Sequence, residues 1–141
     1  MPEQPVTYLM DVPAVKSWAD AKANERTVVL TAVKAGTVLI YNRVWDSAKS
    51  AFPDECETLP KDEFVRKRCN EEHRLAAAAV AESLNATFPI RGGYDDAIEW
   101  TVVGVALSGG YTVVTDERRK QKYQKIDGLL VVTYDELLDL L

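Results

Sequence analysis

Short apolar runs rich in β-branched residues recur along the chain, separated by longer segments in which apolar positions follow helical spacing. Such runs predict buried strands, because β-branched side chains pack well in a sheet that is covered on both faces. The predicted strands are VTYLMD at 6–11, TVLIY at 37–41, YTVVT at 111–115 and LLVVT at 129–133.

The segments between these strands predict helices. Apolar positions in 14–35 form an approximate stripe that breaks near Asn24, which favours two helices, and Gly36 is a typical stop for the second. The run RLAAAAVAESL predicts a long helix over 61–85, since alanine has the highest helix propensity. Further helices are predicted over 43–52, 95–110 and 134–141, with loops at 53–62 and 86–94.

The alternation of strands and helices predicts the fold class. Right-handed βαβ units place strands in parallel and helices on both faces, so we expect an α/β fold, a three-layer α/β/α sandwich with a mostly parallel central sheet. A length of 141 residues suits a single domain over 1–141.

Acidic residues follow several of the predicted strands. Asp11 ends the first strand, Asp46 follows the second, and Asp116 and Glu117 follow YTVVT. Asp95, Asp96 and Glu99 begin the helix that leads into YTVVT. Because ligands of parallel sheets bind outside the carboxyl ends of the strands, we expect these acids to converge at one edge.

A converged set of carboxylates is costly unless protons or a hard cation neutralise it. Mg²⁺ or Mn²⁺ would suit such oxygens, and a metal-bound water can attack a phosphodiester. Each acid also has a structural interpretation. Asp96 and Glu99 have capping-box spacing, Asp11 could cap the next helix, and Asp116 could begin a surface turn.

The charge balance limits how nucleic acid could bind. The formal net charge is −5, so contact with a polyanion requires a local basic patch or a bridging metal. Such a patch follows Glu117 directly, and its residues could hold a phosphate backbone or simply form a solvated face. They are Arg118, Arg119, Lys120 and Lys122, with Lys125 close behind.

The cysteines and the apolar runs of the chain indicate its cellular compartment. Its two cysteines, Cys56 and Cys69, lack CxxC spacing and favour free thiols in a reducing environment. The first residues lack the layout of a signal peptide, and no apolar run approaches the ~18 residues of a membrane span. We therefore expect a cytoplasmic protein that makes no contact with membranes.

Four segments together resemble the PIN-domain family of metal-dependent ribonucleases, which includes the VapC-type toxins of toxin–antitoxin systems. YLMD at 8–11 resembles its first strand and leading aspartate, and EWTVVGVALSGGYTVVTDE at 99–117 resembles its acid, helix, glycine and strand. GTVLIYNRVWDSA at 36–48 and IDGLLVVTYDELLDLL at 126–141 are similar to its second and closing segments. The resemblance implies a PIN-like fold, Mg²⁺ or Mn²⁺, and hydrolysis of RNA.

Position by position, the resemblance also implies site residues. Asp11 takes the place of the first metal-binding aspartate. The second acid falls on Asp46, or strict spacing puts Ser47 there, which would leave a metal short of one ligand. The third falls on Glu99 by spacing or on Asp96 by residue type, with Asp95 a further candidate, and the fourth falls on Asp116 or Glu117. DVPAV replaces the small polar residue and asparagine that usually follow the first aspartate.

Three functional hypotheses follow. The first is a divalent-metal ribonuclease, possibly a toxin paired with an antitoxin, with Asp11, Asp46, Asp96, Glu99 and Asp116 in catalysis and Asp11, Asp96, Glu99, Asp116 and Glu117 as metal ligands. The alternative is a non-catalytic PIN-like module that binds RNA or a protein. A third is a flavodoxin-like phosphoacceptor domain, which would want a lysine after a late strand where this chain has none. A homodimer through the helices between the first two strands is also expected to be feasible.

Overall fold

The computed structural model describes residues 6–68, 70–87 and 97–141. Its sheet has four parallel strands in the order β2-β1-β3-β4. In the register, Leu9 lies opposite Leu39 on one side and Val113 on the other. The strands are β1 (Tyr8–Met10), β2 (Val38–Leu39), β3 (Thr112–Thr115) and β4 (Leu130–Thr133).

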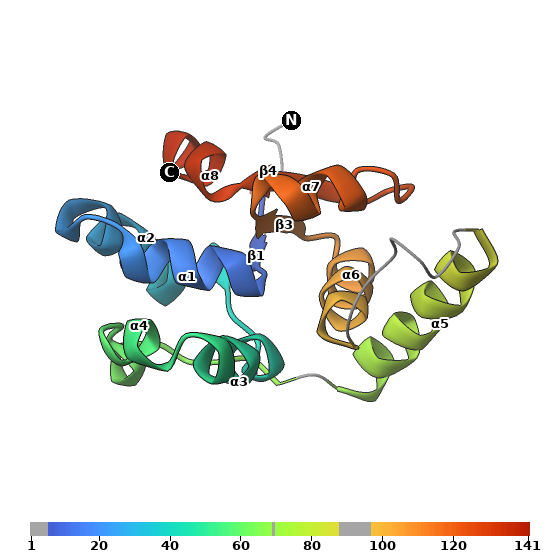
Figure 1. The fold of residues 1–141 in the computed structure, drawn as a ribbon, viewed down its shortest axis with the longest axis horizontal. Coiled ribbons are helices and arrows are strands. Elements are labelled where there is room, and N and C mark those ends of the chain that lie inside the picture. The colour runs from blue at the N-terminus through green and yellow to red at the C-terminus, as the bar shows by residue number, and fades with distance from the viewer. Residues whose placement is uncertain (1–5, 69, 88–96) are drawn as a thin grey trace.

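Helices cover both faces of this sheet. Figure 1 shows α1 and α2 on one side of the strands and α6 on the other, with α5 packed outside α6. This arrangement confirms the predicted α/β/α sandwich, with a sheet that is parallel throughout. The helices are α1 (Val12–Asp20), α2 (Ala23–Ala35), α3 (Asn42–Ala51), α4 (Pro53–Glu57), α5 (Glu71–Thr87), α6 (Ala97–Gly109), α7 (Glu117–Tyr123) and α8 (Tyr134–Leu140).

The core forms where the strands meet the apolar faces of the helices. The central strands β1 and β3 are buried along their whole length, as expected for parallel strands between two helical layers. Trp18 of α1 is fully buried, and its ring lies 5.5 Å from that of Phe64. Trp45 of α3 packs edge-on against the same phenylalanine at 5.7 Å. Phe64 therefore joins α1 and α3 through these two ring contacts.

Local signals explain where several elements begin and end. Gly36 ends α2 with φ of +81°, a left-handed conformation in which glycine avoids the strain of a side chain. Thr133 and Glu136 form a reciprocal capping box at the start of α8. Within the described ranges, no helix combines the length and apolarity needed to cross a bilayer.

Residues 53–70 differ from the prediction. The predicted loop at 53–62 contains α4 and a 3₁₀ turn at Lys61–Glu63, and the predicted helix over 61–85 begins only at Glu71. The reason is tertiary hydrogen bonding. Lys67 donates its N–H to the Ile40 carbonyl at 2.9 Å and accepts from Asn42 N–H at 2.7 Å, so it lies extended beside the end of β2. The predicted loop at 86–94 and the start of the 95–110 helix lie largely outside the described residues.

The connections create a switch point at the centre of the sheet. From β1 the chain moves outward to β2, and from β2 it crosses back to β3 on the other side of β1. The carboxyl ends of β1 and β3 therefore lie side by side where the order reverses, the usual position of ligand sites in such sheets. Asp11 follows β1 and Asp116 follows β3 at this edge.

Candidate functional site

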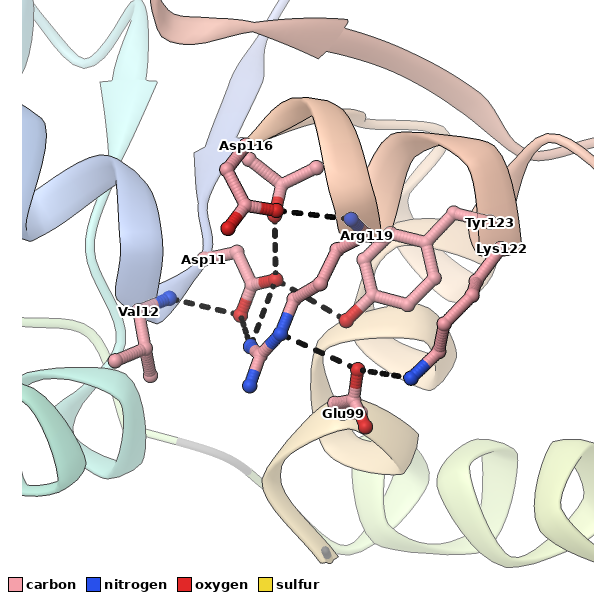
Figure 2. Close-up of polar contacts among 8 residues, drawn as sticks. Asp11, Val12, Glu99, Asp116, Arg119, Lys122 and Tyr123 are labelled. Atoms are coloured by element: carbon pink, nitrogen blue, oxygen red, sulfur yellow. Dashed lines mark hydrogen bonds and ion pairs between the residues drawn. The ribbon is translucent and has the colours of Figure 1, made fainter. Parts of the chain in front are cut away.

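Asp11 is the centre of the polar cluster at the switch point (Figure 2). It is fully buried, and its Oδ1 accepts a hydrogen bond from Val12 N–H at 2.7 Å, which caps α1. Its Oδ2 accepts from the Thr115 hydroxyl at 2.9 Å and the Tyr123 hydroxyl at 3.1 Å. Arg119 Nη1 contacts both oxygens, at 3.0 and 3.1 Å.

Glu99 of α6 is the second buried carboxylate, with 1% of its surface exposed. Its Oε1 lies 3.3 Å from Arg119 Nε and 3.2 Å from Lys122 Nζ. Arg119 therefore bridges the two acids, with its Nη1 on Asp11 and its Nε on Glu99 (Figure 2). Within the part of the chain that the structure describes, these two carboxylates are paired with two bases.

Burial and neighbouring charges change the acidity of the groups around Asp11. Burial disfavours the charged guanidinium, but Asp11, Tyr123 and Glu99 outweigh that effect and raise the pKa of Arg119, so it stays charged. Burial, with Asp11 and Glu99 nearby, raises the pKa of Tyr123 well above its usual range. The phenol therefore remains neutral and can donate to Asp11.

α7 brings these cationic side chains to the site. Asp116 caps this helix by accepting Arg119 N–H at 2.8 Å on Oδ1. Lys122 and Tyr123 follow Arg119 by three and four residues, so each lies on the same face of the helix as Arg119. That face is turned toward Asp11 and Glu99 (Figure 2).

In this arrangement the acids do not fit a divalent cation. The oxygens of Asp11 already accept five hydrogen bonds. A metal placed between Asp11 and Glu99 would occupy the position of the Arg119 guanidinium and be repelled by its charge. Among the described side chains, no group of three or more His, Cys, Asp or Glu residues is positioned to hold a metal ion.

An open hollow of about 420 Å³ lies beside this cluster, and we call it the basic hollow. It lies between α1, α3 and the start of α7, and Arg119 forms part of its wall. Its four basic side chains face a single carboxylate, Asp116. Its basic residues are Lys16, Arg118, Arg119 and Lys122, and the other lining residues include Pro13, Ser17, Ser47 and Phe52.

The structure brings some of the predicted site residues together and separates others. Asp11, Glu99, Arg119 and Lys122 form one cluster, and Asp116 lies directly beside it. Asp46 is exposed on α3, and its neighbour Ser47 lines the hollow, so which of the two takes the family's second-acid position stays a prediction. Asp95 and Asp96 lie outside the described residues.

Two further predicted residues lie outside the basic hollow. Glu117 is exposed and lines a separate hollow with other acids. Lys120 is paired with Glu136 of α8 at 2.5 Å and does not line the basic hollow. Arg118 is exposed and lines the basic hollow, and its contact with a phosphate stays a prediction.

The sequence analysis did not single out Tyr123, Thr115 or Lys16, although all three belong to the site. A helical interpretation of 117–123 could have identified Tyr123, because it follows Arg119 by four residues. Thr115 and Lys16 carry no comparable signal, since their positions depend on the packing of β3 and α1.

No protein-family model matches the chain, and no curated protein matches it by sequence. Solved structures do match its fold. A chain of a DNA-bound VapBC from Salmonella typhimurium has a TM-score of 0.66 at 12% identity, covering 92% of this chain and 98% of that one. VapBC-1 from nontypeable Haemophilus influenzae has a TM-score of 0.64 at 14% identity, covering 92% of this chain and 99% of that one. PAE2754 from Pyrobaculum aerophilum has a TM-score of 0.62 at 18% identity, covering 96% of this chain and 89% of that one.

These likenesses are likenesses of fold. Over more than nine-tenths of the chain the fold is that of VapBC and PAE2754 chains, as the resemblance of the sequence segments predicted. The protein therefore has a PIN-like α/β/α fold in which two buried acids at the switch point are paired with bases from its own α7.

Proposed function

We propose that this protein is a PIN-like module that binds the phosphate backbone of RNA in the basic hollow. The observation that supports this function is the exposed Arg118 at the rim of the hollow, which Lys16 also lines, because the other two bases, Arg119 and Lys122, already pair with buried acids. Phosphate contacts supply most of the affinity in sequence-independent nucleic-acid binding. Because Arg119 and Lys122 pair with Asp11 and Glu99 beneath the hollow, these acids do not cancel the charges of Arg118 and Lys16.

The position of the hollow supports the same proposal. It lies at the carboxyl edge of the sheet beside the switch point, where open parallel α/β sheets bind their ligands. Arg118 is exposed and can reach a phosphate without breaking a buried ion pair. Lys16 is held by Asp20 at 2.6 Å on the exposed surface, a contact weak enough to exchange for a phosphate.

The test is fluorescence anisotropy of a labelled single-stranded RNA in buffer containing EDTA. Arg118→Ala should weaken binding by about 1 kcal/mol, roughly fivefold in Kd, because one phosphate contact is lost. Lys125→Ala is the matched control, since it removes the same charge from an exposed lysine that does not line the hollow. Equal affinities for the two variants would contradict the proposed binding site.

A second candidate function is divalent-metal-dependent cleavage of RNA. It is favoured by the meeting of Asp11 and Glu99 at the edge predicted for a metal site, in a fold shared with VapBC structures. Arg119 would have to leave the acids before a metal could bind. The test is cleavage of an RNA panel with Mn²⁺, comparing the intact protein with Asp11→Asn. Cleavage by the intact protein alone would establish this function, and absence of cleavage in both would support simple binding.

The partners proposed for the protein follow from the same comparisons. Two of the similar structures are VapBC complexes, so a small antitoxin-like protein is proposed as a partner, consistent with a toxin role. A homodimer through α1 and α2 is proposed as well, where Val28 is 44% exposed on α2. Light scattering of the purified chain would measure whether it is a monomer or a dimer in solution.

A further inference from the structure

Arg119 has an unusual position among the cations of the site. Its side chain is 21% exposed, yet it reaches inward from α7 to two carboxylates that are 0% and 1% exposed. Asp11 ends β1 and Glu99 belongs to α6, so one guanidinium joins three separate parts of the chain (Figure 2). Its three contacts with the two acids measure between 3.0 and 3.3 Å.

Two buried carboxylates this close require positive charge between them. Burial raises the cost of each charge, and the mutual repulsion of the acids adds to it. A divalent ion could supply two positive charges, and Arg119 with Lys122 supplies the same number. The chain therefore contains, on one face of α7, the charge that its buried acids need.

We propose that Arg119 is a built-in cation that closes the acid pair to divalent ions, so that removing its side chain opens a Mn²⁺ site at Asp11 and Glu99. Truncation would free both oxygens of Asp11 from the guanidinium and free Glu99 Oε1 from Nε. One or two carboxylates with several waters are a typical environment for such an ion. Since Arg119 lines the basic hollow, its removal would also connect the acids to solvent.

This inference does not depend on the proposed function. It rests on the ion pairs of Arg119, whereas RNA binding rests on the charge of the basic hollow. Uptake of Mn²⁺ and affinity for RNA are measured separately, so failure of one leaves the other standing.

The experiment is isothermal titration calorimetry with MnCl₂, together with melting temperatures measured in rising Mn²⁺. The intact protein should take up no ion at this site and melt at the same temperature throughout. Arg119→Ala should melt at a lower temperature without metal, bind one Mn²⁺, and gain melting temperature as Mn²⁺ rises, by linkage. Arg119→Ala combined with Glu99→Gln should lose most of that uptake, which assigns it to the acid pair.

Arg118→Ala is the control for loss of charge. It removes a positive charge from the same hollow without touching either acid, so it should bind no more Mn²⁺ than the intact protein. If Arg119→Ala does not fold, Arg119→Gln replaces it, because glutamine keeps part of the packing and one amide donor. Uptake by the intact protein equal to that of the variants, or no uptake by the folded Arg119 variant, would overturn the proposal.

Discussion

Asp11 shows how a single buried charge is accommodated in this fold. Its carboxylate has no exposure, and its partners come from α1, β3 and α7. A buried carboxylate that lacks partners costs several kcal/mol, so each of these contacts offsets part of the desolvation of Asp11. The residue thus connects the three elements that meet at the switch point.

Replacing Asp11 with alanine should destabilise the protein strongly. The change leaves the Arg119 guanidinium and the Tyr123 hydroxyl without their buried acceptor and removes the cap of α1. Breaking a buried pair in this way costs about 3–5 kcal/mol. Urea unfolding would measure the loss, with Asp46→Ala as the control, since exposed substitutions usually change stability by less than about 0.5 kcal/mol. Similar values for both variants would contradict the described role of Asp11.

Tyr134 at the start of α8, unlike Asp11, has a buried polar atom without a hydrogen-bond partner among the described residues. It is 6% exposed, and its hydroxyl has no hydrogen-bond partner among the residues that the structure describes. A buried unsatisfied hydroxyl costs about 1–3 kcal/mol. The free energy of unfolding of Tyr134→Phe, measured by urea titration at neutral pH, should therefore be about 1 kcal/mol larger than that of the intact protein. A loss of stability would reveal a hydrogen bond to Tyr134.

The same residue gives a prediction for alkaline pH. Burial raises the pKa of Tyr134 to about 12. The protonated phenol contributes to the free energy of unfolding. This contribution is fully present below the pKa of an unfolded tyrosine, about 10, and is lost as pH rises through about 12. Tyr134→Phe should therefore lose less stability than the intact protein between these values. Parallel losses in urea titrations at pH 9, 10 and 11 would contradict the raised pKa.

At the scale of elements, α7 is the part of the chain that makes the site. Its seven residues carry the basic run, and its N-cap is one of the predicted site acids. Helix geometry sends Arg119, Lys122 and Tyr123 toward the acids and leaves Arg118 at the rim of the basic hollow. Lys120 does not contact these acids, and its ion pair with Glu136 connects α7 to α8.

Substitutions of Asp116 would show whether the carboxylate that caps α7 has a structural role. Asp116→Ala should lower stability by about 1 kcal/mol, because Arg119 N–H loses its cap, and should weaken RNA binding by disturbing the first turn. Asp116→Asn should retain both properties, since an asparagine oxygen caps as well as a carboxylate. Urea titration and anisotropy measure the two effects. An asparagine variant as impaired as the alanine variant would indicate a role for the negative charge itself.

The sequence predicted most elements because their signals are local. The β-branched runs predict the strands, and Gly36 predicts the end of α2. The helix predicted over 61–85 does not include Lys61–Arg68 in the structure, because Lys67 exchanges backbone hydrogen bonds with residues near β2, a contact that no local pattern records. In the site, Asp11 and Glu99 were predicted to converge, and they do. That Arg119 and Lys122 would turn inward to these acids depended on recognising 117–123 as a helix.

At the scale of the whole molecule, charge is distributed unevenly over the edge of the sheet. The net charge is −5, yet the basic hollow has an excess of positive side chains. A second hollow of about 450 Å³ shares Ser17 and Asp116 with it and is lined by acids. Those acids are Asp20, Glu25, Asp116, Glu117 and Asp135. A polyanion approaching this edge is therefore repelled from one side and attracted to the other.

This distribution predicts a dependence of RNA binding on salt. If Arg118 and Lys16, the two bases of the hollow outside the buried ion pairs, each contact a phosphate, the logarithm of the association constant should fall with log salt at a slope of about −1.4 for a single strand. Arg118→Ala should reduce that slope by about 0.7, whereas Lys125→Ala should leave it unchanged. Anisotropy titrations between low and moderate NaCl measure the slopes. A slope near zero for the intact protein would exclude the hollow as a phosphate site.

The central claim, that Arg119 stands where a divalent ion would otherwise sit, is tested most directly by anomalous diffraction from crystals of the intact protein soaked in MnCl₂. The expected map shows the Arg119 guanidinium between Asp11 and Glu99, at the contacts described above, and no manganese peak at either carboxylate. A manganese peak within bonding distance of Asp11, with the Arg119 side chain turned out into the basic hollow, would contradict the claim.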